Sequence, residues 1–170
     1  MQEKLLNLQE AALNEIKDTS SIEAVESLRV KYLGKKGEIT AIHKEMGKLS
    51  AEERPVIGQV ANKVRESIEG SISSKKEELK AIEKQKKLAE EVKRRGGLCE
   101  KWNSGTSGWP DRIVLLPDGK FGFVEVKAPG EEPRPLQLHR HKQLRQLGYK
   151  VYVLDDKDRI GDILDDIQTT

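Results

Sequence analysis

The spacing of apolar residues divides the chain into a helical first half and a second half that contains strands. Apolar side chains recur every three or four positions over residues 5–16 and 22–32, which predicts two amphipathic helices. The same spacing continues over residues 56–92, and no glycine or proline interrupts residues 71–95. We therefore predict one helix over residues 51–95, about 65 Å long at a rise of about 1.5 Å per residue. Such a helix must bury its apolar stripe, so the earlier helices are expected to fold back against it as an antiparallel coiled coil.

Both ends of this long helix carry local signals. Ser50 and Glu53 have the spacing of a capping box, in which a hydroxyl and a carboxylate satisfy backbone N–H groups left open at a helix start. Pro55 falls close to the first turn, where its missing N–H is tolerated. Gly96 and Gly97 suit a C-terminal stop. The signals therefore agree with the long apolar pattern.

The second half alternates predicted strands with helices. The sequence PDGK at residues 117–120 separates two apolar runs, which predicts a β-hairpin. The predicted elements are strands at 98–103, 111–116, 121–127 and 149–155, and helices at 136–148 and 158–167. This order predicts an α/β domain over residues 85–170, joined by the shared long helix to a helical domain over residues 1–84. The predicted fold class is α+β overall.

Composition excludes some classes of protein. Hydrophobic and charged residues each make up 35% of the chain, and no apolar run reaches the roughly 20 residues that a spanning helix needs. Cys99 is the only cysteine, and the first residues form a charged helical pattern, so we expect a cytoplasmic protein without internal disulfides. The net charge of +2 hides a basic segment, since residues 85–150 carry 14 basic and 8 acidic side chains.

Three polar residues stand where folding alone does not require them. Asp111 begins one predicted strand, and alternation places Glu125 and Lys127 on one face of the next. Carboxylates from two adjacent strands form a site of hard oxygen ligands, suited to Mg²⁺ or Mn²⁺, and a neighbouring lysine can orient a water molecule. These are the groups that metal-assisted phosphodiester hydrolysis uses. The alternative is a plain ion pair on an exposed edge strand.

The basic excess of this segment favours contact with phosphate groups. The candidate nucleic-acid-binding residues are Lys93, Arg94, Arg95, Arg134, Arg140, Lys142 and Arg145. Trp102 and Trp109 flank a Gly- and Ser-rich stretch, and they are expected either to stack on a displaced base or to pack in the core. His139 and His141, two residues apart, cannot share a helix face and are expected at the helix surface.

The first half resembles a known family. The sequence LRVKYLGKKGEIT, followed by SAEERP at the start of the long helix, is similar to the N-terminal coiled-coil arm of the bacterial phenylalanyl-tRNA synthetase alpha subunit. The resemblance covers about residues 1–84 and implies an arm that touches tRNA. None of the class II synthetase motifs follows, so no aminoacylation is expected from these 170 residues. Alternatively, the lysines of this arm belong to a solvated, charged helical surface.

The second half resembles the VRR-NUC family of the PD-(D/E)XK superfamily, over about residues 85–155. The resemblance rests on WPD and EVKAP, which place 13 residues between Asp111 and Glu125. It implies a restriction-endonuclease-like fold and a metal-dependent endodeoxyribonuclease that uses Mg²⁺ or Mn²⁺. It also implies a homodimer that cuts branched DNA such as four-way (Holliday) junctions.

The VRR-NUC resemblance also implies roles for individual residues. Asp111 and Glu125 would bind the metal, Val126 would offer its carbonyl oxygen, and Lys127 would serve the attacking water. Gln137 matches a residue that the family keeps near the site, with an ordinary exposed glutamine as the alternative. The family also carries a glutamate on its first helix, for which Glu83 is the candidate here and Glu90 the reserve; both could instead face solvent beside lysines.

The two resemblances together predict a chimera that joins a synthetase-type arm to a nuclease domain through one shared helix. Deliberate engineering is the expected reason for this combination. Two other functions stay open: a helical scaffold or crystallisation fusion, and a tRNA-binding coiled-coil module that carries the nuclease as a passenger.

Overall fold

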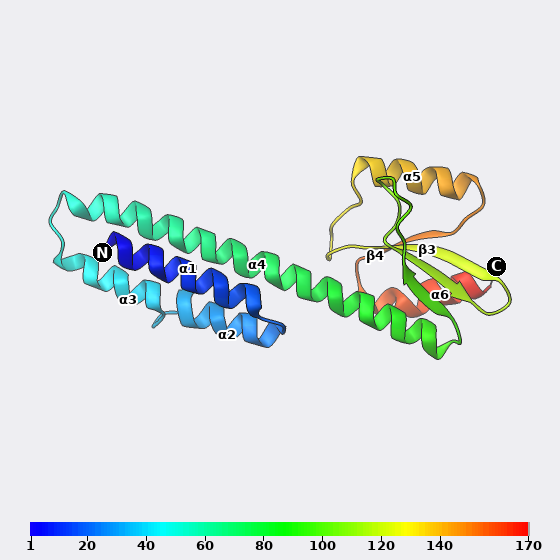
Figure 1. The fold of residues 1–170 in the computed structure, drawn as a ribbon, viewed down its shortest axis with the longest axis horizontal. Helices are drawn as coiled ribbons and strands as arrows, with labels where there is room; N and C mark the ends of the chain where they lie inside the picture. Colours follow the sequence, from blue (N-terminus) through cyan, green and yellow to red (C-terminus); the bar gives the residue numbers. More distant parts are fainter. Residues whose placement is uncertain (170) are drawn as a thin grey trace. The chain divides into compact units, whose positions relative to one another are not determined.

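The computed structural model describes residues 1–169, and these form two compact units (Figure 1). The first unit contains Met1–Leu79, and the second begins at Lys80. The division falls inside one helix, a few residues before the predicted domain boundary between residues 84 and 85. Each unit has a hydrophobic core of its own and is described separately below.

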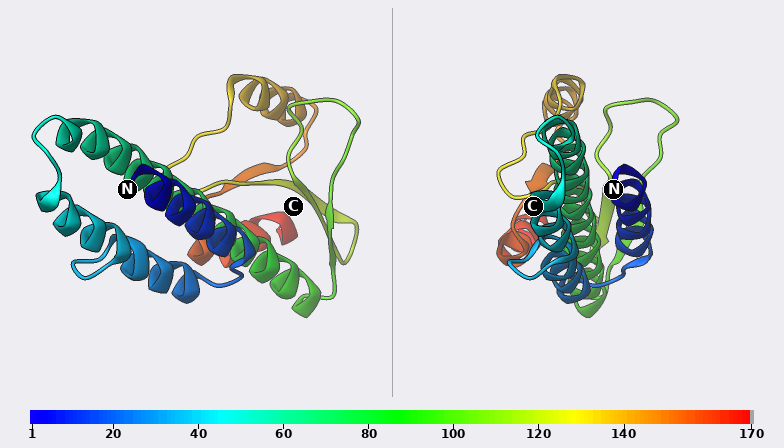
Figure 2. Two further views of the ribbon diagram at one scale, coloured as in Figure 1. Left: turned by 60° about the vertical axis from the view of Figure 1, so that its left-hand side comes forward. Right: turned by 90° about the vertical axis from the view of Figure 1, so that its left-hand side faces the viewer.

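The first unit is entirely helical (Figures 1 and 2). Its elements are α1 (Gln2–Asp18), α2 (Ile22–Leu33), α3 (Glu38–Glu45), a 3-10 turn (Met46–Lys48) and the first part of α4 (Glu53–Arg94). Their apolar stripes meet in a core that includes Leu5, Ala12, Ile16, Val25, Tyr32, Ile39, Ile42, Ala61, Val64, Ile68 and Ile72. The sequence did not predict α3, because Gly34 and Gly37 interrupt the pattern before it and only eight residues follow in the helix.

Helix α4 runs without a break over 42 residues, which confirms the single long helix predicted from the apolar spacing. Its start is the predicted capping box: the Ser50 hydroxyl accepts the Glu53 N–H at 3.2 Å, and the Glu53 carboxylate accepts the Ser50 N–H at 3.3 Å. Among residues 1–169, neither α4 nor any other helix combines the length and the apolar character that a membrane span requires.

The second unit contains a four-stranded mixed sheet in the order β1-β2-β3-β4. The strands are β1 (Leu98–Lys101), β2 (Arg112–Leu116), β3 (Lys120–Val126) and β4 (Val151–Leu154). The first three pair antiparallel, and β4 pairs parallel to β3. Asp118 and Gly119, with φ angles of 62° and 71°, make the tight turn that joins β2 to β3 and matches the twist of a hairpin. Strand β3 is therefore internal, with neighbours on both sides.

Helices cover both faces of this sheet (Figure 1). The end of α4 and helix α6 (Ile160–Gln168) pack on one face, where Val124 and Val126 join Leu88 and Leu164 in the larger core. Helix α5 (Pro135–Gln146) lies on the other face, where its Leu144 packs with Phe123. A short 3-10 turn (Lys157–Arg159) leads into α6. A helical first unit followed by a mixed-sheet unit confirms the predicted fold class.

Gly122 of β3 lies directly against Ile167 of α6, and it provides a test of the packing. A Cβ at this position would lie 2.7 Å from the Ile167 Cδ1 atom, so Gly122→Ala is expected to destabilise the second unit by roughly 1–3 kcal/mol. Trp102 and Trp109 are the only tryptophans, so thermal unfolding followed by tryptophan fluorescence reports this unit alone. The matched control is Gly161→Ala in α6, where nothing lies within 4 Å and helix propensity favours alanine. Equal melting temperatures for the two variants would contradict the proposed clash.

Candidate active site

Asp111 lies where the chain enters β2. The Trp102 N–H donates to the Asp111 carbonyl oxygen at 2.8 Å, which extends the pairing of β1 and β2 to this residue. Arg112 is opposite Val124 across β2 and β3, so the register continues with Asp111 opposite Glu125. The Asp111 Oδ2 atom also accepts the Val126 N–H at 3.0 Å. Backbone pairing thus holds the Asp111 carboxylate at the same end of the sheet as Glu125.

Glu125 is a buried carboxylate on the central strand, with only 1% of its surface exposed. Its Oε1 atom lies 3.1 Å from the Lys127 Nζ atom and accepts a 2.5 Å hydrogen bond from the Gln137 Nε2 atom. Within the described residues 1–169, its Oε2 atom has no hydrogen-bond partner. Burial raises the pKa of Glu125, and the Asp111 charge raises it further, against the opposing effect of Lys127. The site therefore holds a carboxylate whose negative charge is incompletely compensated.

Gln137 joins the start of α5 to this carboxylate. Its Oε1 atom accepts the Arg134 N–H at 2.9 Å, which satisfies a backbone donor at the helix start, while its Nε2 atom donates to Glu125. Pro135 follows as the first helical residue, where a missing N–H costs nothing. The two bonds fix which end of the amide faces the carboxylate.

Lys127 stands just beyond β3, with its side chain 10% exposed. Its N–H donates to the Leu154 carbonyl oxygen at 2.9 Å, and its own carbonyl oxygen accepts a 2.5 Å bond from the Lys84 Nζ atom. Lys84 belongs to α4 and is 5% exposed. Sequence analysis did not single out Lys84, because a lysine between polar neighbours on a helix gives no signal of burial.

Glu83, the candidate first-helix glutamate, is paired with lysines. Its Oε1 atom lies 2.9 Å from the Lys87 Nζ atom and 3.7 Å from the Lys157 Nζ atom, and the hydrogen bond from Lys87 lowers the pKa of Glu83. The reserve candidate, Glu90, lies 4.0 Å from the Lys86 Nζ atom. The α4 side chain that bonds to the end of β3 is Lys84. Among residues 1–169, Glu83 does not gather with Asp111 and Glu125 into a cluster of three acids, so it stands apart from the other four catalytic candidates.

Asp111 and Glu125 are the side chains of the site that could hold a divalent cation. Within residues 1–169, no three His, Cys, Asp or Glu side chains gather closely enough to form a metal site of their own. Mg²⁺ commonly takes one or two carboxylates and completes its shell with water and substrate phosphate oxygens. Asp111 and Glu125 supply this number, and the unpartnered Glu125 Oε2 atom is a free oxygen ligand. The residues present therefore fit Mg²⁺ or Mn²⁺ better than they fit a site of four protein ligands such as structural zinc.

The candidate nucleic-acid-binding residues fall into two groups. Arg94 and Arg95 contact Glu91, Arg140 bonds to Gln143, and Arg145 donates to the Val151 carbonyl oxygen. Arg95 also contacts Asp165 and Gln168 and is largely covered. The remaining candidates, Lys93, Arg134 and Lys142, are exposed. These three leave their charge most available to an external phosphate.

The two tryptophans pack with other aromatic residues rather than standing free. Trp109 lies 5.8 Å from Phe123 and Trp102 lies 6.1 Å from Trp109, measured between ring centroids. The Arg140 guanidinium stands 5.3 Å from the Trp109 ring centre. Core packing therefore accounts for the position of Trp109, while Trp102 keeps 37% of its surface exposed.

The expectation that both helix histidines lie at the surface of α5 was wrong for one of them. His139 is exposed, but His141 is only 1% exposed, and neither of its ring nitrogens has a hydrogen-bond partner in the part of the chain that the structure describes. The polar character of α5 hides this inward face. The available signal was the spacing Gln137, His141 and Leu144, which is that of one helix face.

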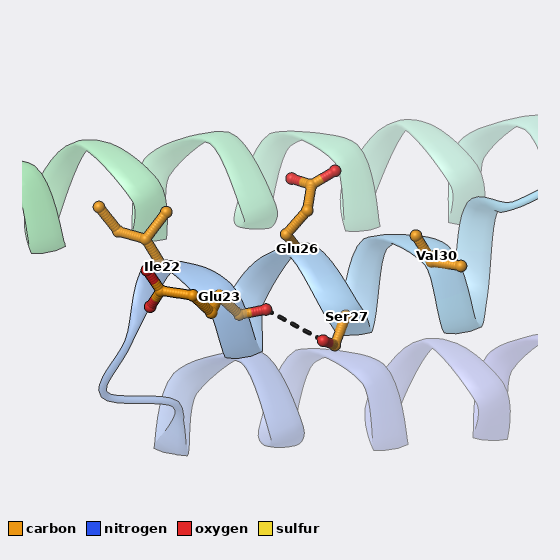
Figure 3. Close-up of a pocket in the computed structure, with 5 residues that line it drawn as sticks. All are labelled: Ile22, Glu23, Glu26, Ser27 and Val30. Atoms are coloured by element: carbon orange, nitrogen blue, oxygen red, sulfur yellow. Dashed lines mark hydrogen bonds between the residues drawn. The ribbon is translucent and has the colours of Figure 1, made fainter.

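The first unit has a surface hollow along α2, shown in Figure 3. Its lining residues are Ile22, Glu23, Glu26, Ser27 and Val30. The Ser27 hydroxyl donates to the Glu23 carbonyl oxygen at 3.0 Å, and Glu26 is engaged by Arg29 and Lys76. Because the polar lining is carboxylate and hydroxyl, this hollow does not suit a phosphate group.

The first half of the chain is similar to known synthetase sequences. The family described as "Aminoacyl tRNA synthetase class II, N-terminal domain" matches residues 20–88. The phenylalanine–tRNA ligase alpha subunits of Clostridium perfringens and Clostridium novyi are 49% and 52% identical to the chain over 92 residues. That of Bacillus subtilis is 51% identical over 89 residues. These matches cover 54%, 54% and 52% of this chain but only 27%, 27% and 26% of the subunits, so the chain spans about a quarter of their length.

A solved structure described as a "VRR_NUC domain" is also similar to the chain. It is 35% identical, and the match covers 51% of this chain and 95% of that one, with a TM-score of 0.48. The chain thus combines a region that matches the N-terminal domain of the synthetase with a similarity to a VRR-NUC domain. The synthetase resemblance predicted from the sequence motifs is confirmed.

The two bonds of Gln137 give a testable prediction about stability. Gln137→Ala removes the acceptor for the Arg134 N–H and a donor to Glu125, so the second unit is expected to lose about 1–2 kcal/mol of stability. Urea unfolding followed by tryptophan fluorescence measures this change. Gln146→Ala, an exposed residue of the same helix, is the control and is expected to change stability by less than about 0.5 kcal/mol. A Gln137→Ala variant as stable as this control would show that the bridge contributes nothing.

Proposed function

We propose that the unit that begins at Lys80 is a metal-dependent nuclease that hydrolyses phosphodiester bonds in DNA. The observation that carries this proposal is the buried Glu125 carboxylate, which has an unpartnered oxygen and lies opposite Asp111. Two carboxylates placed together inside a protein are costly unless a cation compensates them. The WPD and EVKAP motifs, and their resemblance to the VRR-NUC family, support the same function.

Each residue of the site has a role in this proposal. Asp111 and Glu125 would hold a Mg²⁺ or Mn²⁺ ion, with the Val126 carbonyl oxygen as a further candidate ligand. The ion, when bound, supplies Lewis-acid activation of the phosphodiester and of a bound water molecule. Lys127 would orient the attacking water, and Gln137 keeps the Glu125 carboxylate in place. The exposed cations Lys93, Arg134 and Lys142 are available to bind the DNA backbone.

The proposed substrate is branched DNA such as a four-way junction, and the proposed assembly is a homodimer through the nuclease unit. The VRR-NUC resemblance supports both. Symmetry supports the dimer independently, because paired cuts on a two-fold junction need two active sites related by a two-fold axis. We also propose that the chain is an engineered fusion that works in the cytoplasm.

The first functional prediction concerns the metal ligands. Asp111→Asn and Glu125→Gln are expected to lower Mg²⁺-dependent cleavage by on the order of 100-fold or more, because each removes a charged ligand while it preserves side-chain shape. Lys127→Met is expected to slow cleavage but to keep Mg²⁺ binding, measured as the rise in melting temperature on addition of Mg²⁺. Cleavage is measured on linear, flap and four-way DNA, with and without the metal.

Glu83→Gln is the matched control for these variants. Because Glu83 is paired with Lys87 and Lys157, its substitution is expected to leave cleavage within about twofold. A large loss in this variant would instead support Glu83 as the first-helix carboxylate. Undiminished cleavage by Glu125→Gln would remove the basis of the proposed function.

The second functional prediction concerns assembly. Light scattering of the full chain at the concentration of the cleavage assay is expected to give the mass of two chains of 19.2 kDa. Paired cuts on a four-way junction by a strictly monomeric chain would contradict the dimer.

An alternative function, tRNA binding by the first unit, rests on the match of residues 20–88 to the synthetase N-terminal domain. Lys35 and Lys36 are its exposed candidates, whereas Lys31 is paired with Glu15 at 2.8 Å. Retention of the chain on immobilised tRNA, lost in a Lys35→Glu, Lys36→Glu double variant, would favour this alternative. A helical scaffold without activity would pass neither this test nor the cleavage assay.

A further inference from the structure

His141 lies on the inward face of α5, directly beside the proposed active site. Gln137 is four residues before it and bonds to Glu125, and Leu144 is three residues after it and packs with Phe123. Residues at this spacing share one helix face, so His141 belongs to the face of α5 that covers β3. Its 1% exposure agrees with this position.

The imidazole is polar, buried and unsatisfied. Neither Nδ1 nor Nε2 has a hydrogen-bond partner among residues 1–169. A buried donor or acceptor without a partner costs about 1–3 kcal/mol, so an apolar side chain of similar size would serve the core better. Packing alone therefore does not explain the burial of this imidazole.

The charged groups around His141 match the hydrogen-bonding capacity of a neutral imidazole. Burial lowers the pKa of His141, the cations Arg145 and Lys127 lower it further, and the Asp111 carboxylate opposes them. A neutral ring has one acceptor and one donor nitrogen. The Lys127 ammonium only donates, and the Asp111 carboxylate only accepts. Arg145 donates to the Val151 carbonyl oxygen, whereas Lys127 and Asp111 both belong to the proposed site, so we take these two as the partners.

Lys127 and Asp111 also have unused capacity. The Lys127 ammonium has three N–H donors, and its contact with Glu125 uses one of them. Asp111 uses its Oδ2 atom for the Val126 N–H, which leaves its Oδ1 atom available. A cation that binds to Glu125 would compete with Lys127 for the Glu125 Oε1 atom, so the ammonium would then need another acceptor.

We propose that His141 is a positioning residue of this site: in the metal-loaded state its ring accepts a hydrogen bond from the Lys127 ammonium and donates one to the Asp111 carboxylate, directly or through one water molecule. The inference rests on the proposed nuclease function and deepens it. His141 would hold Lys127 at the position from which it orients the attacking water. It would also fix the orientation of a metal-binding carboxylate through a hydrogen bond, as partners of metal ligands commonly do.

The first experiment separates stability from activity. His141→Leu is expected to raise the melting temperature of the second unit by about 4 °C or more, because it removes two unsatisfied buried nitrogens. It is also expected to lower kcat for DNA cleavage about tenfold or more, while KM changes by less than about twofold. His141→Gln keeps one donor and one acceptor and is expected to restore kcat to within about threefold of the parent. His139→Leu, on the exposed face of the same helix, is the matched control and should change neither quantity.

Two results of this experiment would overturn the proposal. A His141→Leu variant with raised stability and unchanged kcat would overturn the proposal and leave His141 as a core residue. Low activity in both His141→Leu and His141→Gln, with lowered melting temperatures, would indicate a packing role and would also overturn it.

A second experiment does not depend on cleavage. The chain has three histidines, so the ring ¹⁵N signals of full-length protein can be assigned by substitution. Addition of Mg²⁺ is expected to shift the His141 ring nitrogens toward hydrogen-bonded values and to leave His43 and His139 unchanged, and Lys127→Met should abolish the shift. Unchanged His141 signals in a protein that binds Mg²⁺ would refute the proposal. If instead neither Mg²⁺ binding nor cleavage occurs in the parent protein, the proposed function itself has failed.

Discussion

The second unit is organised around one electrostatic constraint, the presence of a carboxylate inside it. Glu125 is on the central strand and is covered almost completely, so its charge must be compensated by nearby groups. Lys127 and Gln137 contact one oxygen, and Asp111 brings a second negative charge close to it. Several local features hold these groups in place: the start of α5, the bond from the Trp102 N–H to the Asp111 carbonyl oxygen, and the bond from the Lys127 N–H to the Leu154 carbonyl oxygen.

Much of this arrangement could be predicted because it depends on local periodicity. Alternation along residues 121–127 separates the face of Phe123 and Glu125 from the face of Val124 and Val126, and the two sets lie in different cores. The long helix could be predicted for the same reason, since its apolar spacing continues and no breaker interrupts it. The capping box at Ser50 adds a signal that depends only on neighbouring residues.

The features that escaped prediction depend on tertiary packing. Sequence spacing alone does not determine which of two adjacent polar residues on a helix will face a sheet, and here Lys84 rather than Glu83 reaches the end of β3. The burial of His141 escaped for the same reason, because α5 carries a weakly apolar inner face between Gln137 and Leu144. Helix α3 is short and follows two glycines, so its stability comes from the core that Ile39 and Ile42 enter.

The hairpin between β2 and β3 has a consequence for the spacing of the two acids along the chain. In an antiparallel strand pair, the residue numbers of two opposite residues always add up to the same value, as Arg112 with Val124 and Ile113 with Phe123 show. With the turn at Asp118 and Gly119 unchanged, each added pair of residues lengthens the interval between Asp111 and Glu125 by two. An added single residue in one strand would bring an apolar neighbour of Glu125 opposite Asp111, because it reverses which face each side chain occupies. For this turn, the number of residues between the two acids can therefore change only in steps of two. The spacing of the motif is thus a measure of the length of the hairpin.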